Sequence, residues 1–199
     1  MNDPRPLEGE LDDGQTPLDA DEAHGLIPRW ISTRDDLNEA EAHNIRQSSR
    51  WANRQLDAGV QVASAEFLRG LHRAMFEDVW TWAGIYRQTE RNIGVAPHQI
   101  ATELQNLFDD AAAWREFDSY CLDEQAARLH HRLTWIHPFP NGNGRVSRYA
   151  ADYYLQQQGA AVFTWGASLS SINARKYYLA AIRLADRADY AALLAFVRS

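Results

Sequence analysis

An all-α fold is the class that this sequence predicts, for three reasons. Most segments repeat apolar residues at i, i+3 and i+4, which is the spacing of an amphipathic helix. Residues that favour helix starts, such as Ser64, and residues that end helices, such as Pro138 and Gly159, bound these segments. Only the stretch from Gly84 to Val95 has strand character. With 199 residues, of which 45% are hydrophobic, the chain suits one domain with a buried core.

The first element is an acidic N-terminal arm, residues 1–22. It contains eight acidic residues and a single base, Arg5, whereas residues 23–199 contain acidic and basic residues in equal number. The net charge of −7 therefore belongs to the arm. Its prolines and glycines and its lack of helical periodicity predict an extended or mobile segment ahead of a helical domain at 23–199. Such an arm can serve solubility alone, or lie over a basic groove or meet a basic partner.

The first two helices follow the arm. Asp35 or Asp36 can cap the first helix, whose apolar face extends to Leu56. Ser64 can cap the second, because its hydroxyl can accept a hydrogen bond from a free N–H group of the first turn. The apolar residues of this second helix have helical spacing: Phe67, Leu68, Leu71, Met75 and Phe76.

Five more helices are expected beyond residue 96. A third opens at Pro97, since proline is tolerated in a first helical turn. A fourth begins at Asp123 and ends before Pro138, because the residue before a proline disfavours helical geometry. A fifth covers Val146 to Gln158 and ends at Gly159. The last two helices are expected at 170–185 and 189–197.

The stretch from Gly84 to Val95 separates the second helix from the third. Tyr86, Thr89 and Ile93 have strand character around polar residues that favour turns. The spacing alone leaves two alternatives open, a short β-hairpin and an ordinary helix connection.

The loop from His137 to Arg145, HPFPNGNGR, has the composition of an anion site. Gly142 and Gly144 can adopt positive φ and let the backbone approach a ligand, so that neighbouring N–H groups point into one concavity. The following helix start adds partial positive charge and unpaired donors. The alternative is an ordinary turn, because a glycine-rich loop alone marks a phosphate site only weakly.

Three side chains strengthen the prediction of a phosphate site. Arg145 and Arg148 are three residues apart, so they share one helix face from which each could grip phosphate oxygens. His137 is the group in this loop that can accept a proton near neutral pH. Turn chemistry alone requires none of the three. The loop is therefore predicted to hold a polyphosphate and to activate a hydroxyl.

Residues His137 to Arg148 resemble the signature of the Fic family, H-x-F-x-[D/E]-G-N-G-R-x-x-R, at every specified position but one. The resemblance implies an all-helical fold and transfer of AMP from ATP to a Ser, Thr or Tyr hydroxyl of a target protein. It implies that His137 is the general base and that Phe139 anchors the loop in the core. The residues that it assigns to the nucleotide phosphates are Asn141, Gly142, Asn143, Gly144, Arg145 and Arg148.

Asn141 is the one departure, since the family usually has Asp or Glu there. In the family that carboxylate binds the Mg²⁺ that bridges the nucleotide phosphates. Asn141 offers a neutral carbonyl instead, so we expect a weak Mg²⁺ site. Nucleotide binding is therefore predicted more firmly than efficient AMP transfer.

Other segments extend the resemblance over most of the chain. Thr16 to Asp19, Gly25 to Pro28, Glu90 to Gly94 and Phe163 to Gly166 resemble the subgroup called mobile mystery protein B. The family also has a β-hairpin flap that aligns the target segment by strand pairing. The resemblance therefore favours a flap beside the loop, with four target-docking residues: Arg91, Asn92, Ile93 and Gly94.

The sequence leaves the regulation and two rival functions open. Many family members carry an inhibitory helix with the pattern [S/T]-x-x-x-E-[G/N], which this sequence lacks. We therefore expect inhibition by a separate, antitoxin-like partner or by an unusual segment such as the acidic arm. The two rivals to adenylyl transfer are a nucleotide-binding interaction protein without catalysis and a phosphotransferase of the Doc type, although Doc proteins also alter the glycines of the motif.

Composition argues against several other classes. An acidic chain without a basic stripe gives no support to direct nucleic-acid binding. A single cysteine, Cys121, permits no internal disulfide and no thiolate metal cluster. His130 and His131 lack metal-ligand spacing and are expected to be packed or surface residues. No leader and no run of eighteen apolar residues is present, so we expect a cytoplasmic protein without a membrane segment.

Overall fold

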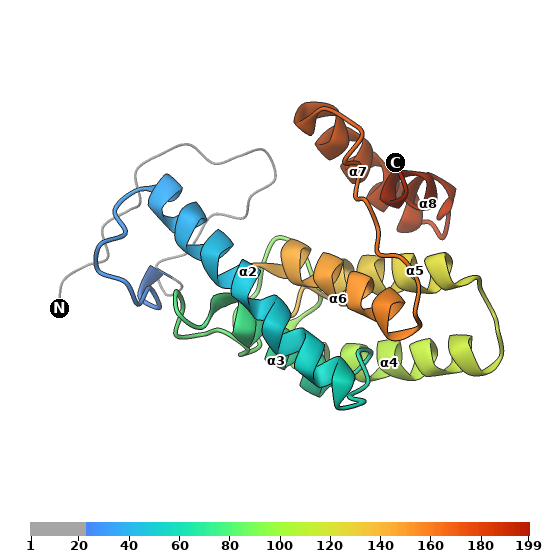
Figure 1. Ribbon diagram of the computed structural model, residues 1–199, viewed down its shortest axis with the longest axis horizontal. Coiled ribbons are helices and arrows are strands. Elements are labelled where there is room, and N and C mark those ends of the chain that lie inside the picture. The colour runs from blue at the N-terminus through green and yellow to red at the C-terminus, as the bar shows by residue number, and fades with distance from the viewer. Residues whose placement is uncertain (1–22) are drawn as a thin grey trace.

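The computed structural model describes residues 23–199, which are mostly helical (Figure 1). The predicted acidic arm, residues 1–22, lies outside the described residues. The α-helices of the described part are α2 (Arg34–Asp57), α3 (Ala65–Phe76), α4 (Ile100–Glu116), α5 (Leu122–Ile136), α6 (Asn143–Gln157), α7 (Ser171–Ala185) and α8 (Ala191–Val197). A 3₁₀ helix, η1 (Pro97–Gln99), leads into α4. The predicted all-α class is confirmed for this part of the chain.

Each predicted helix has a counterpart in the structure, although several starts are shifted by one to three residues. Ser64 caps α3 as predicted, accepting a hydrogen bond from Phe67 N–H. The cap of α2 is Thr33 rather than Asp35 or Asp36, because Asp36 serves as the third residue of a capping box and accepts from the Thr33 N–H. Helix α6 begins at Asn143, three residues before the predicted start.

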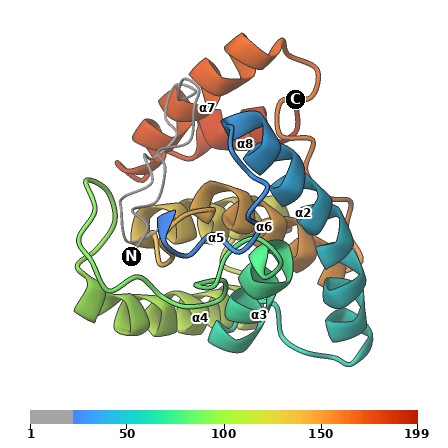
Figure 2. The same cartoon turned by 90° about the vertical axis from the view of Figure 1, so that its left-hand side faces the viewer.

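The antiparallel pair α5 and α6 lies in the middle of the molecule. Helix α4 packs against α5 on one side, α7 and α8 lie on the opposite side, and α3 with α2 covers α6 (Figures 1 and 2). The core between these helices is apolar, and Phe67, Met75, Ala126 and Phe139 are fully buried in it. The loop between α5 and α6 is therefore enclosed by helices from both halves of the chain.

The segment 84–95 does not form the predicted hairpin. Among residues 23–199 the structure shows one isolated bridge, Leu26 to Trp80, and no strand. The buried side chain of Arg87 explains the difference, because its guanidinium donates to the carbonyls of Thr89, Val95 and His137. Backbone groups that a hairpin would pair with each other are taken by this side chain instead.

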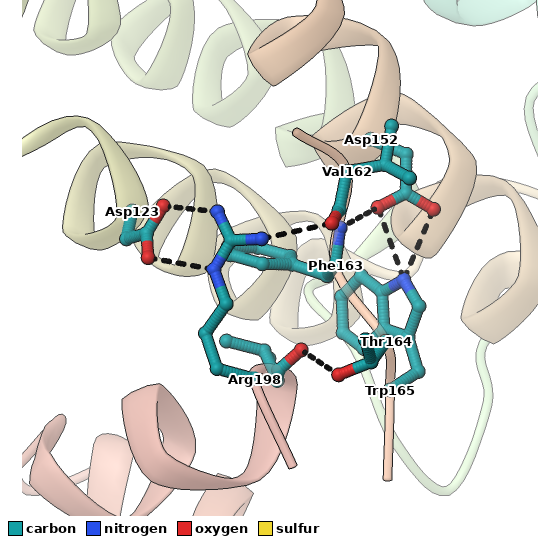
Figure 3. A network of polar contacts seen from close by, with 8 residues as sticks. Asp123, Asp152, Val162, Phe163, Thr164, Trp165 and Arg198 are labelled. Carbon is teal, nitrogen blue, oxygen red and sulfur yellow. Dashed lines mark hydrogen bonds and ion pairs between the residues drawn. The ribbon is translucent and has the colours of Figure 1, made fainter. Parts of the chain in front are cut away.

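The C-terminal helices are held to the body by a polar network (Figure 3). Arg198 forms a two-pronged ion pair with Asp123 of α5, at 2.5 and 2.7 Å, and donates to the Val162 carbonyl. Asp152 of α6 accepts from the Trp165 indole N–H at 3.0 Å, and burial raises the pKa of this carboxyl. These contacts fix the connection between α6 and α7 and so set the position of α7.

No helix within residues 23–199 combines the length and the apolarity that a membrane crossing requires.

Candidate active site

The loop that carries the predicted site connects α5 to α6. Helix α5 ends where His137 adopts the left-handed conformation, at φ 54°. Phe139 is fully buried, and both its N–H and its carbonyl bind the side chain of Asn143, at 2.9 and 2.8 Å. The Asn143 side chain therefore closes the loop, and only its backbone can meet a ligand.

His72 of α3 packs against this loop and holds it in place. Its ring is fully buried and stacks on Phe139 at 3.8 Å between ring centroids. Gly84 N–H donates to Nδ1, so the proton of the neutral ring is on Nε2, which donates to the Asn141 carbonyl at 3.0 Å. Burial lowers the pKa of His72 to about 3, so the ring stays neutral at physiological pH.

Only one of the two motif glycines uses a conformation that favours glycine. Gly142 has φ 75° and a Cβ there would lie 2.6 Å from the Phe76 ring, so a side chain has neither the conformation nor the room. Gly144 lies in the first turn of α6, and a Cβ built on it would meet nothing within 4 Å. That open space lies where the first turn of a helix leaves N–H groups without partners, which suits an anion.

The predicted residues meet at one cavity of about 500 Å³. His137 and all six predicted nucleotide residues line it, from Asn141 to Arg148, and Ile93 does as well. Of the other three predicted docking residues, Arg91 is half-buried, whereas Asn92 and Gly94 are exposed. The structure therefore places the predicted loop residues at one cavity, together with one of the four predicted docking residues.

The general-base candidate is electrically neutral. His137 is 7% exposed, and burial together with the nearby Arg87 and Arg91 charges lowers its pKa to about 4. Arg87 also donates to the His137 carbonyl at 2.7 Å, which holds the left-handed residue in place. A neutral imidazole at pH 7 can accept a proton, as a general base must.

Sequence reasoning missed Glu41, a buried carboxylate on α2. Its oxygens accept from the Trp80 indole N–H at 2.7 Å and from the Arg145 guanidinium at 2.5 Å. Leu37, Glu41 and Ile45 share one helix face, so an acid at four-residue spacing among core residues was the signal available in the sequence. Glu41 fixes the orientation of Arg145 at the cavity.

Arg148 is fixed by aromatic contacts rather than by an acid. Its guanidinium lies over the rings of Tyr178 and Trp165, at 4.6 and 5.6 Å from the ring centroids. The Tyr178 hydroxyl in turn lies 3.1 Å from Nε2 of His130, which is fully buried. His131 is also buried, bound by Asp186 and Tyr190, so the expectation of packed histidines is met.

The cavity offers a metal ion few suitable ligands. The Asn141 side-chain oxygen accepts from the Gly142 N–H at 2.6 Å, and both Glu41 oxygens are occupied as described above. No cluster of three or more His, Cys, Asp or Glu residues within 23–199 could hold a metal. These residues do not fit the carboxylate coordination that Mg²⁺ prefers. The weak Mg²⁺ site at Asn141 stays a prediction, and no step below depends on it.

Comparison with known proteins decides the family. Residues 62–155 match the model of the Fic/DOC family. A Fido domain-containing protein from Dictyostelium discoideum is 31% identical over 108 residues, which cover 52% of this chain and 72% of that protein. The chain belongs to the Fic/DOC family. The narrower likeness to mobile mystery protein B stays a prediction.

Curated relatives of this Fic chain include enzymes. Protein adenylyltransferase fic-1 from Caenorhabditis briggsae is 29% identical over 123 residues, 58% of this chain and 22% of the nematode protein. A uridine 5′-monophosphate transferase from Xanthomonas campestris is 53% identical, over 36 residues only. The chain therefore spans about a fifth of the length of the nematode relative.

Solved structures share the Fic fold. The N-terminal Fic domain of Bep8 from Bartonella sp. 1-1C superposes with a TM-score of 0.67 at 16% identity, over 89% of this chain and 95% of that domain. BepC from Bartonella tribocorum, solved with bound AMPPNP, gives 0.65 at 18% identity, over 98% and 96%. At these identities the likeness shows the fold alone.

Proposed function

We propose that this chain is a protein adenylyltransferase, which transfers AMP from ATP to a Ser, Thr or Tyr hydroxyl of a target protein. The observation that carries the proposal is the meeting of a neutral His137 with the start of α6, Arg145 and Arg148 at one cavity. Family membership and the named activity of the nematode relatives agree with it. A base, an anion cradle and two guanidinium groups are what phosphoryl-centre chemistry requires.

The reaction follows from the positions of these groups. In this proposal the ATP phosphates bind at the N-terminus of α6, where a first helical turn leaves backbone N–H groups without partners and where Arg145 and Arg148 line the cavity. His137 takes the proton from the target hydroxyl, whose oxygen attacks the α-phosphorus. The new bond joins that oxygen to the α-phosphorus, and the bond from the α-phosphorus to pyrophosphate breaks. The guanidinium groups stabilise the charge that develops on the phosphate oxygens.

The target segment is proposed to lie along residues 91–94. Ile93 lines the cavity and is 49% exposed, so it can contact both the nucleotide site and an incoming chain. A target segment that docks by backbone contacts can carry varied side chains, and the reaction requires only that it present a hydroxyl.

Radiolabel position tests the reaction. A cell lysate is incubated with the chain and with ATP labelled at either the α- or the γ-phosphate, and labelled proteins are resolved on a gel. We expect label from α-labelled ATP and none from γ-labelled ATP. The variant His137→Ala should lose this label, because general-base help typically contributes about 10²–10⁴-fold.

The same experiment separates the rival functions. Label from the γ-phosphate alone would identify a phosphotransferase, and no label with ATP bound would identify an interaction protein without catalysis. The short match to a uridine monophosphate transferase favours one further arm, with α-labelled UTP. Stronger labelling from UTP than from ATP would replace adenylyl by uridylyl transfer, with the same residues in the same roles.

A separate inhibitory partner is proposed on the sequence pattern. The inhibitory helix motif of many family members does not occur in this chain, so control by another protein or by the acidic arm is left. Expression of the chain alone tests this. Growth arrest that His137→Ala abolishes would support a toxin, and a harmless yet fully active chain would contradict it.

A further inference from the structure

The cavity contains more cationic side chains than the sequence motif accounts for. Arg175 of α7 lines it together with Arg145 and Arg148 of α6. Neither Arg148 nor Arg175 forms an ion pair with another residue of 23–199, and the Nε atom of each is buried without a hydrogen-bond partner. Buried donors without partners are costly unless a ligand satisfies them. Two converging guanidinium groups of this kind predict an anion between α6 and α7.

The carboxylate of the same cavity already has hydrogen-bond and ion-pair partners. Glu41 is its one carboxylate among the described lining residues, and Arg145 and Trp80 occupy both of its oxygens. Asn141 replaces the expected acid with an amide whose oxygen accepts from Gly142 N–H. A divalent cation would therefore meet guanidinium charges without a free carboxylate to offset them.

We infer that this cavity binds the phosphates of its nucleotide without a divalent metal ion, and that Arg175 is a third guanidinium clamp beside Arg145 and Arg148. The inference rests on the proposed function and adds a residue from outside the motif, on a different helix. The guanidinium groups, rather than a metal ion, then offset the negative charge of the phosphates. Arginine suits this role because its planar fork can bind two phosphate oxygens at once.

The position of α7 makes such a clamp feasible. Tyr178, one turn after Arg175, packs against the Arg148 guanidinium, so α7 and α6 are in contact at the cavity. The network of Asp123, Asp152 and Arg198 fixes the connection before α7 (Figure 3). Arg175 therefore belongs to a wall whose placement is independent of the loop.

Isothermal titration calorimetry of the full chain with ATP tests the inference, with excess Mg²⁺ in one buffer and EDTA in the other. We expect the two dissociation constants to agree within about threefold, because no protein ligand holds the ion. Asn141→Asp should behave oppositely: ATP binding weakens in EDTA, since a carboxylate then faces the phosphates, and Mg²⁺ strengthens it by about tenfold or more. Its labelling rate should also become dependent on Mg²⁺.

Arg175 is tested in the EDTA buffer. Arg175→Gln should weaken ATP binding by about tenfold or more, the usual effect of losing a charge-assisted hydrogen bond. The matched control is Lys176→Gln, which removes the neighbouring charge of the same helix from an exposed position outside the cavity, and should bind as the parent does. If Arg175→Gln does not fold, as thermal melting will show, Arg175→Lys keeps the charge but loses the fork and should still weaken binding.

The outcomes are distinct. Tenfold tighter ATP binding by the parent chain in Mg²⁺ than in EDTA would overturn the metal-free clamp while leaving the proposed function intact. Equal binding by the Arg175 and Lys176 variants would remove Arg175 from the site. Absence of ATP binding in both buffers would overturn the proposed function itself.

Discussion

Lowering the pH from about 7 to about 5 should strongly destabilise the fold, because three imidazoles are buried in the neutral form. Burial lowers the pKa of His72 and of His130 to about 3, and that of His137 to about 4. An unfolded histidine titrates near 6.5. The folded state therefore binds fewer protons than the unfolded state between pH 6.5 and these values, so stability is complete above pH 6.5 and is lost as the pH falls below it.

The magnitude follows from the same values. At pH 5 an unfolded imidazole is almost fully protonated while each buried one is not, which costs about 2 kcal/mol per histidine relative to pH 7. Three such groups lower the free energy of unfolding by about 6 kcal/mol, against a typical total of roughly 5–15 kcal/mol. For His72 the structural cause is visible, since a proton on Nδ1 would displace the hydrogen bond from Gly84.

Urea unfolding at several pH values, followed by tryptophan fluorescence, measures this loss. His72→Gln should have lower stability at pH 7 but about one third less of the pH dependence, because one of three titrating groups is gone. His98→Gln is the control, since His98 is exposed and its replacement should leave the pH dependence unchanged. Should His72→Gln not fold, His130→Phe tests the same reasoning at the second buried ring.

A parent chain whose unfolding free energy changes by less than about 1 kcal/mol between pH 7 and pH 5 would refute the reasoning. So would a His72 variant that keeps the full pH dependence.

Three further predictions concern the loop and the C-terminal network. Phe139→Ala removes a fully buried ring that stacks on His72, and should cost about 3–5 kcal/mol in urea unfolding. Gly142→Ala should lower the melting temperature and weaken ATP binding, because its Cβ would lie 2.6 Å from the Phe76 ring; a variant as stable as the parent would show that the ring yields. Arg198→Ala should cost about 1 kcal/mol or less, since the ion pair with Asp123 is about one third exposed; a loss of several kcal/mol would mean that the network is essential for the fold.

The helices could be predicted from the sequence because each carries its own signals. The apolar spacing of 67–76 and the Ser64 cap are local, and the structure repeats both. The start of α6 was missed by three residues, because Asn143 begins the helix while its side chain reaches back to Phe139, a contact between turns that periodicity does not report.

The flap and the cavity wall show where local reasoning stops. Residues 84–95 have strand character, but the buried Arg87 side chain binds the carbonyls of Thr89 and Val95 and, from the motif loop, that of His137. Glu41 and Arg175 reach the site from helices far from the motif in sequence, so only the packing of α2 and α7 against α6 reveals them. The motif residues that line the cavity lie within twelve consecutive positions, so a local pattern is enough to group them.

The position of α7 has a consequence for the timing of synthesis. The residues of the motif, 137–148, emerge from the ribosome before α7, which contributes Arg175 to the cavity. Arg198, whose ion pair with Asp123 helps to hold the connection to α7, emerges later still. A nascent chain that displays the motif therefore lacks Arg175 at the cavity. The proposed three-arginine clamp is therefore complete only after translation has passed the C-terminal helices.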